Sequence, residues 1–180
     1  MVHRIYISTV AYFTWVMLLL LVPIQWCLGL VLAISVHELG HLLLLYVLKI
    51  PIHGVELHAT GVRIHASQIG RGEELVCAAA GPLASFCAAF VWKRVFPEMA
   101  LCAMVQGYFN LLPVYPMDGG RILRCLAPDA VCGAMEIIAL ILLWGWGIWS
   151  GLGRDICFFT MLPAIASTIR VIPGKFPCKE

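Results

Sequence analysis

The pentapeptide His37-Glu38-Leu39-Gly40-His41 lies inside an apolar run over residues 27–48. At about 1.5 Å per residue, this run can cross the hydrocarbon core of a bilayer, about 30 Å thick, as a helix. On a helix, His37 and His41 lie one above the other on the same face, where both can bind one metal ion. Glu38 is then close enough to act on a water at that ion. The sequence therefore predicts metal chemistry inside a membrane.

A purely structural role for this motif is the weaker interpretation. With only six histidines in the 180 residues, chance produces about 0.008 matches to His-Glu-x-x-His per chain of this composition. Ionisable side chains at membrane depth are also costly unless they are paired or bound to a metal. Both the pattern and its position therefore favour a functional site.

The composition is typical of a polytopic membrane protein, since 62% of the residues are hydrophobic and only 12% are charged. We expect an all-α fold with about six transmembrane helices, at residues 6–26, 27–48, 75–92, 99–112, 131–149 and 156–172. The chain is expected to form a single domain, with a core at 27–126, accessory helices at 1–26 and 131–172, and no cleavable signal peptide. No basic run interleaved with aromatic residues is present, so nucleic-acid binding is not predicted.

The distribution of positive charges predicts the orientation in the membrane. If the N-terminus is cytoplasmic, all but three of the twelve Lys and Arg residues fall on the cytoplasmic side, and Lys93, Arg94 and Arg154 fall outside. Cytoplasmic loops carry the excess of Lys and Arg, so both termini are predicted to be cytoplasmic. His41 is about 12 Å along the helix from the interfacial Lys49, which puts the metal inside the hydrocarbon and nearer the cytoplasmic face.

The segment between the second and third helices predicts a small β-hairpin at the membrane surface. Residues 55–59 and 62–66 alternate between apolar and polar side chains, with a turn near 60–61. His53, His58 and His65 fall in this region, where solvated histidines are ordinary, so metal contact by them is the less favoured interpretation. The eight cysteines show no CxxC spacing and are interpreted as small buried hydrophobic residues.

The fourth segment, residues 99–112, is short, and the sequence NLLPVYPMDGG at 110–120 cannot continue a regular helix. Entering from outside, this broken fourth helix ends at about the depth estimated for His41, so Asp118 can meet the two histidines. A carboxylate oxygen is a suitable third ligand for zinc and leaves a fourth position for water. The alternative is an exposed turn, because Asp-Gly-Gly is also common in turns. The estimated depth of Asp118 in the membrane favours its interpretation as a metal ligand.

Several other polar and small residues are predicted to serve helix packing or to lie at the membrane interface. Small residues in the third segment, Gly81 and Ser85 among them, permit close packing against a neighbouring helix. Arg121 and Arg124 lie on a predicted short interfacial helix, where their side chains can reach water. Glu136 is expected near the membrane interface rather than at a catalytic site.

Together, HELGH at 37–41 and NLLPVYPMDGG at 110–120 resemble the site-2 proteases, the M50 family of zinc intramembrane metalloproteases. The sequences QIGRGEE at 68–74 and NLLPVYPMDGGRIL at 110–123 look most like the bacterial branch of stage IV sporulation protein FB. The CBS and PDZ domains that many relatives carry are not recognised in this sequence. The narrower resemblance implies a membrane-associated transcription factor precursor, or its anchor, as substrate.

The resemblance also implies roles for individual residues. It implies one Zn²⁺ ion held by His37, His41 and Asp118, with Glu38 as the base that deprotonates the bound water. Three further residues are implied to shape the segment against which a substrate strand lies: Asn110, Pro113 and Pro116. The stretch Gly81-Pro82-Leu83-Ala84-Ser85 is similar to a helix-packing motif of the family that often ends in asparagine.

The function implied is that of a zinc metalloendopeptidase that cleaves a peptide bond in or near the transmembrane segment of a membrane-associated protein. Its expected partners are that substrate, the lipid bilayer and an inhibitory membrane protein; the oligomeric state is left open. A membrane metal-binding or transport protein, and a non-proteolytic scaffold derived from a protease, are the alternatives. Transport usually needs a chain of polar residues through the membrane, and few are available beyond the motif.

Overall fold

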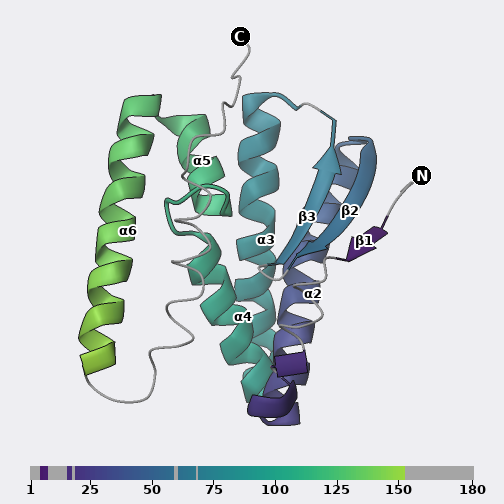
Figure 1. The fold of residues 1–180 in the computed structure, drawn as a ribbon. Helices are drawn as coiled ribbons and strands as arrows, with labels where there is room; N and C mark the ends of the chain where they lie inside the picture. Colours follow the sequence, from purple (N-terminus) through teal and green to yellow (C-terminus); the bar gives the residue numbers. More distant parts are fainter. Residues whose placement is uncertain (1–4, 8–15, 18, 59–60, 68, 153–180) are drawn as a thin grey trace.

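The computed structural model describes residues 5–7, 16–17, 19–58, 61–67 and 69–152, which form a mostly helical structure with a small sheet at one side (Figure 1). The elements are, in chain order, β1 (Ile5–Ile7), α2 (Ile24–Val47), β2 (Ile52–His58), β3 (Gly61–Ala66), α3 (Arg71–Trp92), α4 (Pro97–Asn110), α5 (Asp118–Leu126) and α6 (Asp129–Leu152). Helices α2, α3 and α4 pack against one another, α5 packs on α3, and α6 on α5.

Three described helices are long and apolar enough to cross a membrane: α2, α3 and the part of α6 from Asp129 to Trp146. Their outward faces carry large apolar side chains such as Leu43, Phe90 and Ile141, which are 64–70% exposed in the structure and suit contact with lipid. The chain is an integral membrane protein. Helix α4 has 14 residues and is therefore only about 21 Å long. The predicted sixth helix, residues 156–172, lies outside the described residues.

The expectation of one helix over residues 6–26 is wrong at its start. Residues Ile5–Ile7 form strand β1, which pairs in parallel with residues 55–57 of β2. The β-branched and aromatic side chains of Ile5, Tyr6 and Ile7 suit a strand, and the pairing satisfies backbone groups at the edge of β2. Residues 8–15 and 18 lie outside the described part. Helix α2 begins at Ile24, directly after Pro23, and so earlier than the predicted start at 27.

The sheet has the order β1-β2-β3, with β2 and β3 antiparallel. Val55 lies opposite Ile64, and His58 lies opposite Gly61 at the end of the pair. The sequence predicted two strands in this region, whereas the described sheet contains a third from the N-terminal segment. The sheet lies outside the helical core (Figure 1).

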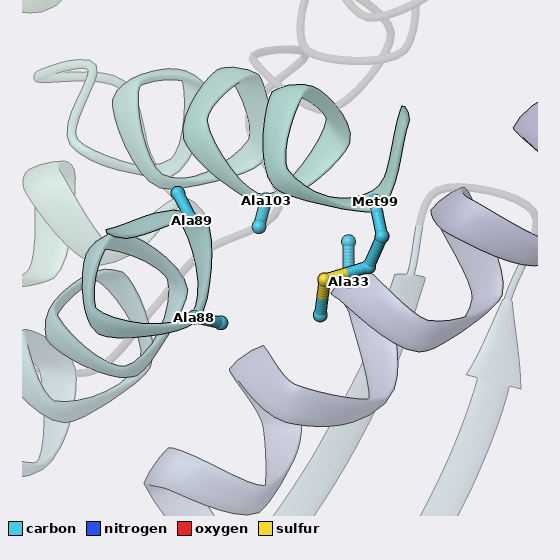
Figure 2. Close-up of a cluster of buried hydrophobic side chains, with 5 residues drawn as sticks. All are labelled: Ala33, Ala88, Ala89, Met99 and Ala103. Atoms are coloured by element: carbon cyan, nitrogen blue, oxygen red, sulfur yellow. The ribbon is translucent and has the colours of Figure 1, made fainter. Parts of the chain in front are cut away.

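Four alanines and one methionine form a buried cluster at the centre of the helices (Figure 2). The cluster consists of Ala33 from α2, Ala88 and Ala89 from α3, and Met99 and Ala103 from α4. Its members are at most 7% exposed. In lipid the hydrophobic effect does not drive helices together, so close packing through small residues takes its place.

Two glycines of α2 set its distance from the neighbouring helices. A Cβ at Gly40, inside the pentapeptide, would lie 2.7 Å from the carbonyl oxygen of Ala80 and 2.8 Å from Cβ of Ala84 on α3. A Cβ at Gly29 would lie 2.9 Å from the backbone nitrogen of Met99 on α4. Both contacts are shorter than real Cβ contacts, so α2 needs glycine at these positions. The contact at Gly40 brings the pentapeptide directly against α3.

Residues 111–117 form an irregular segment between α4 and α5. Within it, the Val114 N–H donates to the Leu112 carbonyl at 2.8 Å, and the Met117 N–H donates to the Val114 carbonyl at 2.9 Å. Val114 is fully buried and anchors the segment. A Cβ at Gly119 or Gly120 would overlap the backbone of Leu111 or Val114. The two glycines after Asp118 therefore let the segment fold back onto the start of α5.

Candidate metal centre

His37 and His41 lie on the buried face of α2, because four residues make slightly more than one helical turn. They are 2% and 8% exposed, and their Nε2 atoms are 3.3 Å apart. Asp118, the first residue of α5, joins them: its Oδ2 is 3.1 Å from His37 Nε2 and 3.2 Å from His41 Nε2. Among the described residues, these three form a group able to hold a metal ion.

The dimensions of this group fit one zinc ion. With Zn–N and Zn–O bonds of about 2.0–2.1 Å and tetrahedral angles, neighbouring ligand atoms lie about 3.3 Å apart. The three ligand atoms here are 3.1, 3.2 and 3.3 Å apart. These separations fit three ligands of one zinc ion, and an ion held by them would have a further position for water or substrate.

The outer nitrogens of both rings have partners on α3. His41 Nδ1 is 2.8 Å from the carbonyl oxygen of Cys77, an atom that only accepts, so Nδ1 carries a proton and donates it. A neutral imidazole with its proton on Nδ1 has its lone pair on Nε2, and this is the form that binds a metal. His37 Nδ1 is 2.9 Å from the Ser85 hydroxyl. Metal-binding histidines usually have such a partner on the other ring nitrogen.

Ser85 has a contact that sequence reasoning missed. It was predicted to serve helix packing; the structure places it fully buried on α3, with its hydroxyl in hydrogen-bond contact with the His37 ring. One signal in the sequence was its spacing of four from Gly81, which puts both residues on one helix face. Which neighbour that face meets cannot be read from one sequence.

Gly81 leaves open the space beside the two ring nitrogens. A Cβ at this position would overlap Nε2 of His41 and lie 2.8 Å from Nε2 of His37. The missing side chain lets α3 approach the group, and the adjacent Pro82 is fully buried. Both residues were predicted for helix packing, and Gly81 in addition borders the candidate metal centre.

The second oxygen of Asp118 faces Arg121. Arg121 Nη1 is 3.7 Å from Asp118 Oδ1, and Arg121 Nε donates to Glu74 Oε1 of α3 at 3.1 Å. One carboxylate oxygen is thus directed at the histidines while the other is paired with a cation. The interpretation of Arg121 as a merely interfacial residue missed this contact, although its i+3 spacing from Asp118 was a usable signal.

The other predicted site residues lie on α2, at the end of α4 and in the segment that follows it. Glu38 is half-buried on α2 between the two histidines. Asn110 is the last residue of α4, and its side-chain amide donates to the Gln106 carbonyl at 3.0 Å. Pro113 and Pro116 are half-buried on the path of the chain from α4 to Asp118.

The histidines of the sheet are placed differently. His53 is exposed on β2, and its Nε2 is 2.9 Å from the Ser67 hydroxyl. Within the described residues it belongs to no group of three metal-ligating side chains. The side chains of His58 and His65 lie outside the described part of the structure.

Comparisons with known proteins give a curated relative and a solved structure of similar fold, while no family model matches the chain. A curated zinc metalloprotease from Methanocaldococcus jannaschii is 33% identical over 107 residues, a match that covers 52% of this chain and 32% of that protein. The chain thus spans about a third of the length of the curated relative that it matches.

The solved structure is the site-2 protease from Methanocaldococcus jannaschii, with a TM-score of 0.67 and 23% identity. The superposition covers 97% of this chain and 94% of that chain. The chain therefore has the site-2 protease fold, and the resemblance to this family is confirmed. The comparisons do not support the narrower assignment to the sporulation branch.

Proposed function

We propose that this chain is an intramembrane zinc metalloendopeptidase, which cleaves a peptide bond in or near the transmembrane segment of a membrane-associated protein. The observation that carries the proposal is the convergence of His37, His41 and Asp118 from two separate elements onto a triangle of zinc-ligand dimensions. The group lies beside Gly81, which is near the middle of α3 and about 15 Å along that helix from its first residue. The likeness to a zinc metalloprotease adds support.

In this proposal the two histidines and Asp118 hold the ion, and Glu38 is the general base. Zinc, when bound, lowers the pKa of a water toward about 7 and polarises a carbonyl oxygen. The Glu38 carboxylate accepts the proton of the attacking water and returns it to the leaving amine. Ser85 and the Cys77 carbonyl keep both imidazoles turned so that Nε2 faces the ion.

A substrate helix must unwind before it is cleaved, because helical carbonyl groups are already hydrogen-bonded and shielded. We assign to residues 111–117 the surface along which the unwound strand lies. Asn110 ends α4 in front of this segment, and Pro113 and Pro116 prevent it from forming a helix, since proline lacks the N–H that a helix needs. An irregular backbone at membrane depth is tolerated where protein or a water-filled cavity surrounds it.

The finer features of the proposal concern the orientation and the substrate. The charge distribution supports cytoplasmic termini and a site nearer the cytoplasmic face. A transcription factor precursor or its anchor is the substrate class that the family resemblance supports, because a domain cut from such a protein is released on that side. An inhibitory membrane protein is the expected regulator.

The experiment compares wild type with Glu38→Gln in proteoliposomes that contain a tagged membrane-anchored substrate. We expect the variant to keep its zinc and to lose cleavage by a factor of about 10²–10⁴, the usual contribution of a general base. Cleavage by Glu38→Gln at the wild-type rate would contradict the mechanism.

Zinc uptake into the same vesicles tests the alternative of a metal-transport protein. We expect no zinc uptake beyond that of protein-free vesicles. Zinc flux without cleavage of any membrane substrate would favour transport instead.

A further inference from the structure

Glu136 is an acidic residue on α6, within one of the three helices apolar enough to span a membrane. Its side chain is only 17% exposed. A charge in such a helix is costly unless it has partners, and it usually marks a function. The chemistry proposed above does not use Glu136.

The contacts of Glu136 reach the irregular segment between α4 and α5. The backbone N–H of Tyr115 donates to Glu136 Oε1 at 3.1 Å. The other carboxylate oxygen, Oε2, is 3.8 Å from Nη2 of Arg124 on α5. The Arg124 guanidinium also lies over the Tyr115 ring, with Cζ 4.2 Å from the centroid. The three residues thus close a ring of contacts that joins α6, α5 and the segment.

These contacts matter because residues 111–117 have no continuous helical hydrogen bonds to hold them. The N–H groups of Val114 and Met117 are bonded inside the segment. The N–H of Tyr115 is instead bonded by a charged side chain from another helix, and such hydrogen bonds are among the stronger ones. The orientation of the Tyr115 peptide therefore depends on α6.

We propose that Glu136 is a positioning residue for substrate binding. By accepting the Tyr115 N–H and pairing with Arg124, it holds residues 111–117 in the conformation against which the substrate strand docks. This inference rests on the proposed function, because the segment is the assigned docking surface. The candidate ligands have separate supports in Ser85, the Cys77 carbonyl and Arg121, so Glu136 acts on substrate binding rather than on zinc.

The first test measures hydrogen exchange of peptides that cover residues 111–117, in wild type and Glu136→Ala. We expect faster exchange in the variant, because the Tyr115 N–H loses its acceptor. Glu136→Gln keeps one acceptor oxygen but loses the charge that pairs with Arg124, so its exchange should lie between those of wild type and Glu136→Ala. Ile137→Ala is the matched control, since Ile137 is the next residue on α6 and is 59% exposed. Unchanged exchange in Glu136→Ala would overturn the proposal.

The second test separates substrate binding from zinc binding. For Glu136→Ala we expect KM for the membrane substrate to rise about tenfold, with zinc content unchanged and a smaller change in kcat. Arg124→Met, which keeps an apolar chain but removes the charge, should act in the same direction and serves if Glu136→Ala does not fold. Loss of zinc from Glu136→Ala, or a fall in kcat with KM unchanged, would contradict a role in substrate positioning.

The two proposals fail in different ways. Hydrogen exchange and zinc content are measured without any substrate, so they decide the role of Glu136 at Tyr115 even if no cleavage is found. If instead exchange is unchanged while wild type cleaves its substrate and Glu38→Gln does not, the proposed function stands and the inference on Glu136 is wrong.

Discussion

The imidazole rings of the candidate centre are oriented by α3 rather than by their own helix. The i, i+4 spacing puts His37 and His41 on one face of α2, but the direction of each Nε2 depends on Ser85 and on the Cys77 carbonyl. The sequence contains the first kind of information and not the second, because a helix periodicity says nothing about the partner helix. The candidate metal ligands could therefore be predicted from the sequence, whereas the groups that orient their rings could not.

Gly81→Ala is expected to weaken zinc binding at least tenfold, because the new Cβ overlaps Nε2 of His41 and crowds that of His37. Competition with a chromophoric chelator measures the affinity. Gly133→Ala makes the same chemical change on α6, where nothing lies within 4 Å, and should leave zinc binding unchanged. Wild-type zinc affinity in Gly81→Ala would show that the space beside the rings is not needed.

Ser85→Ala removes the hydrogen-bond partner of His37 Nδ1 and should lower zinc affinity about 10–100-fold, as loss of such a partner usually does. Ser35→Ala is the control, because the Ser35 hydroxyl bonds its own helix at the Val31 carbonyl and is exposed. The same chelator competition applies to both. Equal zinc affinity in the two serine variants would argue against a role for Ser85 in the centre.

At the scale of elements, the early end of α4 was readable because Pro113 and Pro116 cannot continue a helix. The long apolar helices were readable for the same kind of reason, since length and composition decide them. Strand β1 was not readable: its three residues continue directly into an apolar run, and its partner strand lies about fifty residues further along the chain. Pairing between distant segments leaves no local pattern.

Arg121 of α5 contacts both Glu74 of α3 and the outer oxygen of Asp118. We expect Arg121→Met to lower zinc affinity by about three- to tenfold, a modest loss because Arg121 and Glu74 are about one-third exposed. Glu74→Gln should lower zinc affinity less than Arg121→Met does.

The double variant Glu74→Gln/Arg121→Met should bind zinc no more weakly than Arg121→Met alone, because both changes remove the same contact between Glu74 and Arg121. Zinc affinities of the four proteins complete the cycle. Fully additive losses would mean that Glu74 and Arg121 act on the metal centre independently.

For the whole molecule, the bound ion is expected to tie α2 to α5, two elements far apart in the sequence. Removing it with a chelator should lower Tm, because a ligand at about 100 times its Kd contributes about 2.7 kcal/mol to the stability of the folded state. For a chain of this size, we expect a fall of about 5–10 °C in thermal denaturation in detergent, reversed by added zinc. Identical melting curves with and without zinc would indicate that the ion does not link these elements.

In the proposed function, a carboxylate at the start of α5 and two imidazoles of α2 hold one ion within the membrane. Zinc content and affinity of purified Asp118→Ala, beside wild type and Glu38→Gln, test it most directly. We expect one zinc per chain in wild type and Glu38→Gln, and a zinc affinity at least about a hundredfold lower in Asp118→Ala. Wild-type zinc content and affinity in Asp118→Ala would contradict the claim.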